Sequence, residues 1–333
     1  MNLTNLTSTE IENQTKTVYD IAIIGAGPAG LTAAIYALRD NKNVILFEKN
    51  IEGGQVLSTP KIDNIPGFYG ISGQHFINLM GCQIQSITEA GFGSIDTEYS
   101  EVVDVSGMVL TDGTVVHTLR TENDDWFIAQ KVIFATGNKN RTLGVPGERE
   151  LIGKGICFCV TCDGPFYKNK DVAVIGGGNS ALTEALELSE YANHVMLLQD
   201  LQQLTAEKSL VEEIKKRKNI DVMTNCKVLA FTQTYNPQNS SSKIVVELPN
   251  YLSLAVDGVF EAIGFIPDNS VAKNVYDIDE NGYLVNLQGT NGVFAAGDCR
   301  AKMHRQIVLA CADGAEAAIK ACQQLNQGVK WRQ

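Results

Sequence analysis

The chain has 333 residues, of which 44% are hydrophobic and 20% are charged. This length predicts two domains, and the composition is typical of a globular protein with enough apolar residues for a core. The formal net charge of −11 argues against nucleic acid or an anionic membrane as a partner, because both are negatively charged.

Residues 1–17 predict a disordered lead. They are rich in Asn and Thr, and they lack the positively charged start and continuous apolar run of a signal peptide. No window approaches the roughly 18 apolar residues of a membrane span. We therefore expect a cytoplasmic protein with no membrane contact.

The first patterned stretch, residues 20–48, predicts a dinucleotide-binding unit. A strand at 20–24 is followed by a glycine-rich turn, a helical pattern and a second strand at 43–47. The turn, Gly25-Ala26-Gly27-Pro28-Ala29-Gly30, has the spacing G-x-G-x-x-G. Between a strand and a helix, this spacing predicts a pyrophosphate at the helix N-terminus.

Each glycine of this turn has its own expected role. Gly25 permits the tight turn, Gly27 lets the backbone approach a pyrophosphate, and Gly30 lets the helix and strand pack closely. Glu48 follows the second strand, where an acid is expected to bind a ribose hydroxyl. The alternative is a glycine turn that serves packing alone.

The next segment predicts a loop, a helix and a meander. Residues 52–73 are loop-like and long enough to suggest a function, and residues 74–91 have a helical pattern. Between 95 and 134, short β-rich runs alternate with turns such as residues 111–113, which predicts an antiparallel meander. The last strand ends at Ala135-Thr136-Gly137.

A second βαβ pattern begins at Asp171 and makes the chain an internal duplication. Its strand, residues 171–175, is followed by the turn Gly176-Gly177-Gly178-Asn179-Ser180-Ala181, a helical pattern and a strand at 194–198. That strand ends at Gln199-Asp200, where the first unit has Glu48-Lys49.

The sequence Cys159-Val160-Thr161-Cys162-Asp163 lies between the two units. The chain has eight cysteines, at 82, 157, 159, 162, 226, 299, 311 and 322, and only the 157–162 group is tightly clustered. In an intracellular chain this pattern predicts a redox or metal motif rather than a disulfide framework. The alternatives are half of a zinc site or two unreactive core cysteines, and Cys157 is expected to be a packed thiol.

The remaining elements complete the second unit and return to the first. We expect a helix at 209–218 that ends in the basic run Lys215–Lys218, where cations suit a helix C-terminus. Strands follow near 221–231, 243–248 and 256–264. A strand at 292–298 ends in Gly297-Asp298, and a helix at 306–325 finishes the chain.

From about residue 18, the chain resembles the low-molecular-weight thioredoxin reductase family of flavoproteins. The resemblance implies an α/β fold with two Rossmann-like, three-layer dinucleotide-binding domains, the second inserted into the first. It implies a discontinuous FAD-binding domain at 18–138 and 268–333, and a hinged, pyridine-nucleotide-type domain at 139–267 that carries the dithiol. A homodimer is also implied. The matching stretches are Gly25–Gly30, Gly53-Gly54-Gln55, Asn64-Ile65-Pro66-Gly67, Ala135-Thr136-Gly137, Cys159–Asp163, Gly176–Ala181, Gly297-Asp298 and Arg305-Gln306.

The resemblance also implies a set of FAD-binding residues. The first glycine turn would hold the pyrophosphate and Glu48 the adenosine ribose. Gln55 and Asn64 would lie near the flavin, Asp298 at the ribityl or pyrophosphate region, and Gln306 at the isoalloxazine edge. The full set is Gly25, Gly27, Pro28, Ala29, Gly30, Glu48, Gly54, Gln55, Asn64, Ala135, Thr136, Gly137, Gly297, Asp298, Arg305 and Gln306.

Cys159 and Cys162 would be the redox-active pair, with Cys162 facing the flavin and Cys159 attacking the disulfide of thioredoxin or a thioredoxin-like protein. Asp163 would be their proton donor and acceptor. The residue types suit this chemistry, because thiol–disulfide exchange needs a thiolate attacker and a leaving sulfur that can be protonated. No metal is expected.

One family feature is missing. NADPH-dependent members carry His-Arg-Arg…Arg after the second strand of the inserted domain, and Gln199, Asp200, Leu201 and Thr205 stand there instead. Losing several charge-assisted bonds, each worth about 1.5–3 kcal/mol, should weaken NADPH binding by orders of magnitude.

Three hypotheses for the electron donor follow. The favoured one is ferredoxin, as in the ferredoxin-dependent flavin thioredoxin reductases and the related clostridial and cyanobacterial proteins. The others are NADH bound through Gln199 or Asp200, and NADPH bound through another basic group. Ferredoxins are acidic, so docking would need a local basic patch, for which Lys215–Lys218 or Lys302, His304 and Arg305 are candidates.

Two further alternatives complete the expectations. Trp331 could cover the flavin, although a surface or dimer-contact position is favoured. The protein could also be a non-catalytic, flavin-bound redox sensor, against which the intact dithiol and Asp163 argue.

Overall fold

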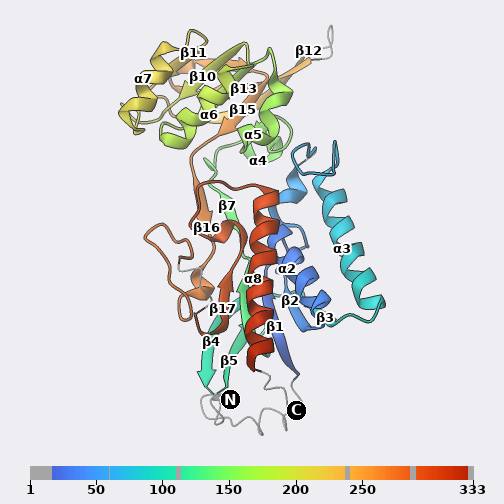
Figure 1. Ribbon diagram of the computed structural model, residues 1–333. Helices are drawn as coiled ribbons and strands as arrows, with labels where there is room; N and C mark the ends of the chain where they lie inside the picture. Colours follow the sequence, from blue (N-terminus) through green and yellow to red (C-terminus); the bar gives the residue numbers. More distant parts are fainter. Residues whose placement is uncertain (1–16, 60, 110–113, 237–240, 286–289, 329–333) are drawn as a thin grey trace. The chain divides into compact units, whose positions relative to one another are not determined.

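The computed structural model describes residues 17–59, 61–109, 114–236, 241–285 and 290–328 (Figure 1). The chain divides into two compact units: unit 1 comprises Met1–Lys139 and Ile266–Gln333, and unit 2 comprises Asn140–Phe265. The second unit is therefore inserted into the first. The predicted lead, the turn at 111–113 and Trp331 lie outside the described residues, except that residue 17 is described.

Unit 1 is built on a seven-stranded sheet with the order β3-β2-β1-β6-β5-β4, in which β17 also pairs with β6. β1, β2, β3, β6 and β17 form parallel pairs, whereas β4, β5 and β6 are antiparallel neighbours. The strands are β1 (Val18–Ile24), β2 (Asn43–Phe47), β3 (Ser94–Glu98), β4 (Val102–Val109), β5 (Val115–Thr121), β6 (Trp126–Phe134) and β17 (Val293–Ala295).

Alternate residues of β1 enter two different cores. Ile21 and Ile23 pack with the helices α2 (Pro28–Arg39), α3 (Gly73–Glu89) and α8 (Ile307–Gly328). Ala22 and Ile24 pack on the opposite face with residues of β4, β5 and the segment before β17. Because both faces of the second half of β1 are buried, the run Ile21–Ile24 is continuously apolar rather than alternating. Figure 1 shows α8 alongside α2, although they are far apart in sequence.

Unit 2 repeats the plan on a five-stranded parallel sheet with the order β11-β10-β9-β15-β8. Its strands are β8 (Ile156–Cys157), β9 (Asp171–Ile175), β10 (His194–Leu198), β11 (Ile220–Met223) and β15 (Gly258–Glu261). Short elements complete the connections: α4 (Glu148–Leu151), α5 (Val160–Asp163) and η3 (Gly164–Tyr167).

The sheet of unit 2 lies between two further layers. Val172 and Val174 of β9 pack against α6 (Asn179–Ser189) and α7 (Lys208–Lys216). Ala173 and Ile175 pack against the antiparallel sheet β12-β13-β14. Its strands are β12 (Ala230–Asn236), β13 (Ser241–Glu247) and β14 (Ser253–Val256). The predicted three-layer α/β class is confirmed.

Four predicted elements need correction. The first strand of the predicted meander, β3, is parallel to β2, because the helix α3 returns the chain in the same direction. The predicted strand at 221–231 breaks into β11 and β12 at Asn225, which has a left-handed φ of 54°. The predicted strand at 256–264 is the two strands β14 and β15, and the helix α7 ends at Lys216, before Lys218.

The chain passes between the units at two short strands. β7 (Asn138–Asn140) pairs with β16 (Phe265–Pro267) in a two-stranded sheet. No helix among the described residues is both long and apolar enough to cross a membrane.

Candidate functional site

The first glycine turn joins β1 to α2 as its sequence predicts. Gly25 has a φ of 107°, and a Cβ there would overlap the carbonyl oxygen of Ala135. A Cβ on Gly30 would overlap the carbonyl oxygen of Gly25. Gly27 is the N-cap of α2 and Pro28 its first residue, a position where proline loses no hydrogen bond.

Gly27 faces open space rather than packed atoms. The nearest heavy atom to a Cβ on Gly27 would be the carbonyl oxygen of Gly53 at 4.0 Å, and a Cβ on Gly54 would lie 3.8 Å from the Gly27 Cα. Nothing would lie within 4 Å of a Cβ on Gly137. The backbone at Gly27, Gly54 and Gly137 thus forms an open cradle at the N-terminus of α2, because none of these residues has a side chain that would fill it. It fits a pyrophosphate, which needs close backbone N–H groups.

Glu48 lies beside this cradle at the end of β2. Its carboxylate accepts hydrogen bonds from the backbone N–H groups of Ala26, at 3.1 Å, and Asn50, at 3.0 Å. The carboxylate is thereby fixed next to the turn, where it could also accept a bond from a ribose hydroxyl.

A cavity of about 210 Å³ opens next to Glu48. Gly25, Glu48 and Thr136 line it together with residues that the sequence did not indicate: Lys49, Ser100, Glu101, Val102, Val103, Asp268, Ser270 and Val271 among them. Lys49 bridges Glu101 at 3.0 Å and Asp268 at 3.1 Å. The cavity brings together the strand ends of β2, β4 and β6, and it suits the adenosine end of a dinucleotide.

Three further predicted residues of unit 1, Gln55, Asn64 and Thr136, each donate a side-chain hydrogen bond. Gln55 of η2 (Gly54–Ser58) donates to Asn138 through its amide nitrogen. The amide of Asn64 donates to the Gln306 side-chain oxygen at 3.1 Å, so these two residues, 242 positions apart, are brought together. Thr136 donates to Asn269 at 2.8 Å.

Asp298 lies in the short helix η7 (Gly297–Cys299), and Arg305 and Gln306 directly precede α8. Burial raises the pKa of Asp298, and Lys302, 3.1 Å away, opposes the rise. Arg305 stacks over the Tyr283 ring at 4.6 Å. Lys302 also forms an ion pair with Asp313 of α8 at 3.1 Å. This lysine, which the sequence suggested as a docking residue for ferredoxin, is therefore already paired with two acids of unit 1.

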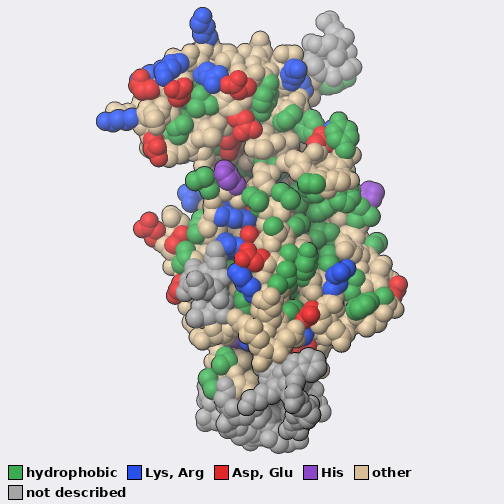
Figure 2. Space-filling view, in the orientation of Figure 1, with side chains coloured by type: hydrophobic (Ala, Val, Ile, Leu, Met, Phe, Trp, Pro, Cys, Tyr) green, Lys and Arg blue, Asp and Glu red, His purple; other side chains and the backbone are tan. Residues whose placement is uncertain are grey.

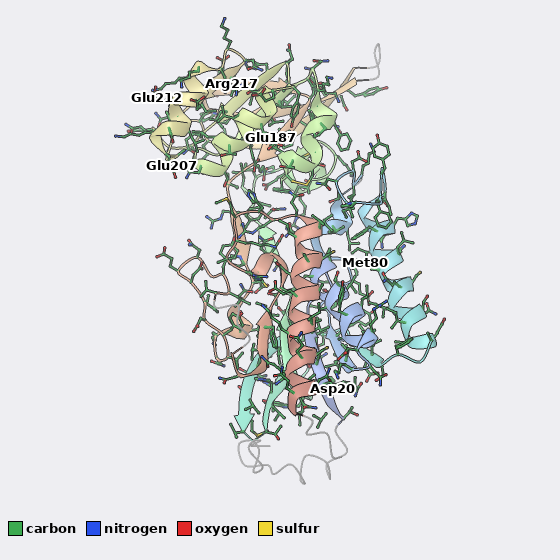
Figure 3. All side chains as sticks on the ribbon, viewed as in Figure 1. Asp20, Met80, Glu187, Glu207, Glu212 and Arg217 are labelled. Carbon is green, nitrogen blue, oxygen red and sulfur yellow. A yellow bond between two sulfur atoms is a disulfide. The ribbon has the colours of Figure 1, made fainter. Side chains whose placement is uncertain are left out.

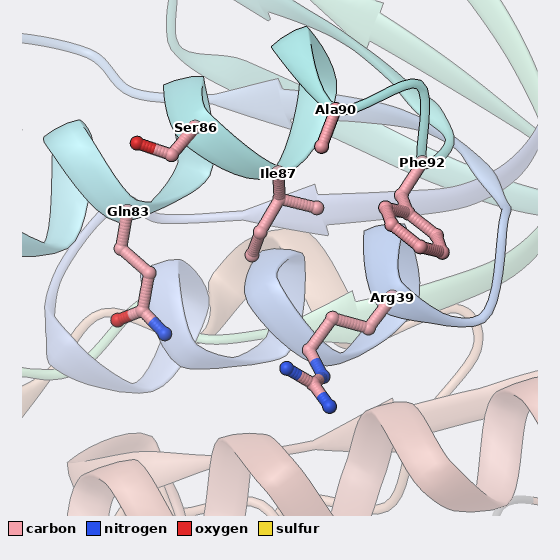
Figure 4. A pocket seen from close by; sticks show the side chains of 6 residues that line it. All are labelled: Arg39, Gln83, Ser86, Ile87, Ala90 and Phe92. Atoms are coloured by element: carbon pink, nitrogen blue, oxygen red, sulfur yellow. The ribbon is translucent and has the colours of Figure 1, made fainter.

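A second cavity, of about 270 Å³, lies between the C-terminal parts of α2 and α3 (Figure 4). Its lining, from Arg39, Gln83, Ser86, Ile87, Ala90 and Phe92, includes none of the predicted site residues. We assign it no role in the site.

The predicted redox pair lies on unit 2 and is joined as a disulfide. Cys159 is the N-cap of α5, and its sulfur accepts a hydrogen bond from the Cys162 N–H at 3.2 Å. The Asp163 N–H donates to the Cys159 carbonyl at 2.9 Å. Because a helical turn joins positions i and i+3, the C-x-x-C spacing places both sulfurs on one side of α5.

Asp163 and Cys157 titrate unusually beside this disulfide. Burial raises the pKa of Asp163 to about 6, although a hydrogen bond with Cys157 opposes the rise. Burial and the nearby Asp163 raise the pKa of Cys157 to about 12. A carboxyl with a pKa near neutrality can both give and take a proton at physiological pH. Among the described residues no group of three His, Cys, Asp or Glu is placed to hold a metal ion.

The second glycine turn is surrounded by neutral and acidic side chains. A Cβ on Gly177 would overlap the amide of Gln199, and the Thr205 hydroxyl donates to the Gly177 carbonyl at 3.2 Å. Asn179 and Glu207 bond to each other twice, at 3.1 and 2.8 Å. Of the described side chains for which the structure shows a contact with this turn, none is cationic.

The basic run at the end of α7 is largely neutralised. Lys215 pairs with Glu212 at 2.8 Å, Lys216 with Glu213 at 2.6 Å, and Arg217 with Glu190 at 2.6 Å. Figure 3 marks Glu212, Arg217 and Glu207 in this part of unit 2. On the face shown in Figure 2, red and blue side chains are interspersed over unit 2 rather than gathered into a basic patch.

Several residues of the site carry no sequence signal. Asn138, Asn269 and Asp313 hold the loops around the first cradle, and Asn269 donates to the carbonyls of both Gly282 and Cys299 at 2.9 Å. Asp313 accepts from the Gly297 N–H at 3.0 Å. Isolated Asn and Asp residues in loops and helices form no motif, so only the fold reveals them.

Comparisons with known proteins place the chain in a family. Residues 19–324 match the family model described as "Pyridine nucleotide-disulphide oxidoreductase". The thioredoxin reductase of Peptoclostridium acidaminophilum is 37% identical over 314 residues, covering 91% of this chain and 96% of that protein. A 34.2 kDa protein in the rubredoxin operon of Clostridium pasteurianum is also 37% identical, over 309 residues, covering 91% and 96%.

The fold matches solved structures as well. The thioredoxin reductase of Streptococcus pyogenes MGAS5005 superposes with a TM-score of 0.83 at 31% identity, covering 94% of this chain and all of that one. The thioredoxin reductase of Giardia duodenalis superposes with a TM-score of 0.80 at 27% identity, covering 93% of this chain and all of that one. This chain belongs to the pyridine nucleotide-disulphide oxidoreductase family, as an FAD-binding, thioredoxin reductase-like oxidoreductase.

Proposed function

We propose that this protein reduces the disulfide of thioredoxin or a thioredoxin-like protein through Cys159 and Cys162, and that its electron donor is not NADPH. The proposal that the electron donor is not NADPH rests on one observation: Gln199, Thr205 and Glu207 surround the second glycine turn. A 2′-phosphate needs cationic partners in a partly buried site, and Asp200 and Glu207 would repel it.

The FAD site is proposed on unit 1. The cradle at Gly27, Gly54 and Gly137 would hold the pyrophosphate, Glu48 the ribose, and the adjoining cavity the adenine. Asp298, Gln55, Asn64 and the pair Arg305-Gln306 would complete the site. When bound, FAD supplies two-electron redox chemistry, which suits a protein whose other reactive group is a two-electron dithiol.

The dithiol performs the transfer to the acceptor. The Cys159 thiolate attacks one sulfur of the acceptor disulfide, forming a mixed disulfide and releasing the other acceptor sulfur as a thiolate. The Cys162 thiolate then attacks the Cys159 sulfur, which re-forms the internal disulfide and releases the acceptor with both sulfurs reduced. Asp163, adjacent to Cys162, takes the proton that Cys162 loses and supplies one to a leaving sulfur. The acceptor gains two electrons and the dithiol loses two.

Ferredoxin is the favoured donor, because a one-electron iron–sulfur donor needs no dinucleotide site on unit 2. The alternatives are NADH, bound at the second turn through Gln199 or Asp200, and NADPH, bound through another basic group. The paired charges at the end of α7 and at Lys302 do not favour these as the basic patch for an acidic ferredoxin. A non-catalytic redox sensor is the alternative of another class. A homodimer and a cytoplasmic location are further parts of the proposal.

The reduction of thioredoxin by Cys159 and Cys162 is tested with protein that has been reduced by dithionite and freed of excess reductant. It is mixed with oxidised thioredoxin under anaerobic conditions. We expect two thioredoxin disulfides reduced per FAD-loaded chain, because the reduced dithiol and the reduced flavin each hold one electron pair. Cys159→Ser should abolish the transfer, and Cys226→Ser, a buried cysteine in the core of unit 2, should leave it intact. Transfer by the Cys159→Ser variant at the normal rate would refute the assigned exchange.

A further inference from the structure

A third thiol lies beside the redox pair. Cys157 is on β8 and its sulfur lies 3.5 Å from the Tyr167 hydroxyl oxygen. The Asp163 carboxyl at the end of α5 is close enough to the thiol for each group to shift the pKa of the other. The strand β8, the helix α5 and the helix η3 thus each contribute one polar group to a single cluster. None of the family motifs includes Cys157.

Tyr167 is held firmly in this cluster. Its ring packs edge-on against Phe260 with the centroids 5.2 Å apart, and a Cβ on Gly258 would overlap the ring. The ammonium of Lys170 lies 5.3 Å from the ring centre. Because β15 supports the ring, the hydroxyl has a fixed position from which to reach the Cys157 sulfur.

The donors and acceptors of the cluster define its hydrogen-bond direction. An ionised Asp163 carboxylate can only accept, so the Cys157 S–H must donate to it. The sulfur is then left as an acceptor for the Tyr167 O–H. Burial and the neighbouring Asp163 raise the pKa of Cys157 to about 12, so the thiol keeps its proton at physiological pH. A thiol in this state is a poor nucleophile and does not compete with the redox pair.

We propose that Cys157 is a positioning residue for disulfide exchange: its S–H, oriented by the Tyr167 hydroxyl, holds the Asp163 carboxyl and stabilises the carboxylate after Asp163 has given up its proton. The inference rests on the proposed function only for the role of Asp163 as the group that moves the proton.

Other charged groups surround the cluster. Glu187 of α6, labelled in Figure 3, accepts a hydrogen bond from Thr161 at 3.5 Å. Glu184 lies one turn earlier on the same helix, and Asp257 faces Tyr167. The pKa of Asp163 itself is set by burial, which raises it, and by the Cys157 thiol, which lowers it. The thiol is therefore the contact whose removal is expected to move the titration of Asp163.

The experiment titrates Asp163 in the oxidised protein, using infrared difference spectra of the protonated carboxyl band with Asp163→Asn as the blank. For Cys157→Ala we expect the midpoint to rise by roughly one pH unit, because the carboxylate loses a hydrogen bond to a charged group. Cys157→Ser keeps a donor, so its midpoint should stay at or below that of the unmodified protein. Tyr167→Phe should raise the midpoint by a smaller amount.

The control is Cys226→Ala, another cysteine of unit 2, which should leave the midpoint unchanged. If Cys157→Ala does not fold, Cys157→Ser and Tyr167→Phe still carry the test. Unchanged midpoints in the Cys157→Ala and Tyr167→Phe proteins would overturn the proposal, as would a Cys157→Ser midpoint that rises like that of Cys157→Ala. The measurement uses neither thioredoxin nor an electron donor, so its outcome is independent of whether the protein reduces thioredoxin.

Discussion

The Gln199 side chain is packed directly against Gly177, so closely that a Cβ on Gly177 would overlap the Gln199 amide. Gln199 is only 5% exposed, and its side-chain oxygen accepts a hydrogen bond from the Asp200 N–H at 3.0 Å. The residue that ends β10 is thus a neutral amide fixed on the glycine turn, followed by an acid. On this contact rests our proposal that the second turn keeps the architecture of a dinucleotide site without the positive charge that a 2′-phosphate would need.

Adding positive charge beside this turn should create NADPH binding. Asp200→Arg combined with Thr205→Arg removes one acid and adds two cations at exposed positions. Each new charge-assisted bond is worth about 1.5–3 kcal/mol, so the Kd for NADPH should fall roughly 100-fold or more. Isothermal titration with NADPH measures the change. Glu247→Arg combined with Thr232→Arg, at exposed positions on β13 and β12, changes the net charge by the same amount and is the control for charge alone. Equal NADPH affinities in the double variant and the control would contradict the account.

Alanine at Gly27 should weaken FAD binding, whereas alanine at Gly30 should weaken folding. A Cβ on Gly27 would meet open space, so Gly27→Ala should fold normally but bind FAD at least roughly tenfold more weakly, because the methyl group enters the pyrophosphate cradle. Gly30→Ala forces a Cβ into the Gly25 carbonyl and should destabilise folding by about 1–3 kcal/mol or more. Flavin content and thermal unfolding of the apoprotein separate the two effects. Normal FAD affinity in Gly27→Ala would argue against the cradle.

Glu48 should contribute to FAD affinity through its fixed carboxylate. Glu48→Ala removes the acceptor for the Ala26 and Asn50 N–H groups and for a ribose hydroxyl. A loss of about 1.5–3 kcal/mol, or roughly 10–100-fold in the Kd for FAD, is expected. Equilibrium dialysis of FAD against the apoprotein measures it. Glu52→Ala is the control, because Glu52 bonds to the exposed Tyr99 instead.

Glu261 should make unit 2 less stable as the pH rises. It is 4% exposed at the end of β15, and burial, followed by the neighbouring Glu148, raises its pKa to about 9. Between its ordinary pKa of 4.5 and about 9, the folded state binds a proton that the unfolded state has lost. Stability therefore falls with increasing pH across this window.

Glu261→Gln should remove this dependence, because a neutral amide replaces the acid and can donate to Glu148. At pH 7 the variant should be more stable by about 1–3 kcal/mol, and the gain should vanish near pH 4.5. Thermal unfolding across pH measures the difference, with the exposed Glu247→Gln as control. A gain that is independent of pH would show that Glu261 does not titrate as described.

The two βαβ units and the redox turn could be predicted from the sequence because their signals are local. Gly25, Gly27 and Gly30 reflect backbone geometry within one turn, and the C-x-x-C pair reflects one helical turn. The contact between Asn64 and Gln306 joins residues far apart in the chain, and no local pattern reveals it.

Charge compensation is the other feature that the sequence could not show. Lys215–Lys218 is a basic run in sequence, but Glu190, which pairs with Arg217, comes from a different helix end. The direction of β3 likewise depends on how α3 crosses the sheet rather than on the composition of the strand. Such features arise from tertiary packing, which overrides local preference.

The central claim, that electrons do not arrive from NADPH, is tested most directly by anaerobic reduction of the bound flavin. NADPH, NADH and reduced ferredoxin are each offered to the FAD-loaded protein, and the loss of flavin absorbance is followed. We expect rapid bleaching by reduced ferredoxin and none by micromolar NADPH. Bleaching by NADH alone would identify NADH as the donor, bound at the second glycine turn with its free ribose 2′-hydroxyl near Gln199 or Asp200. Rapid bleaching by low micromolar NADPH would contradict the account.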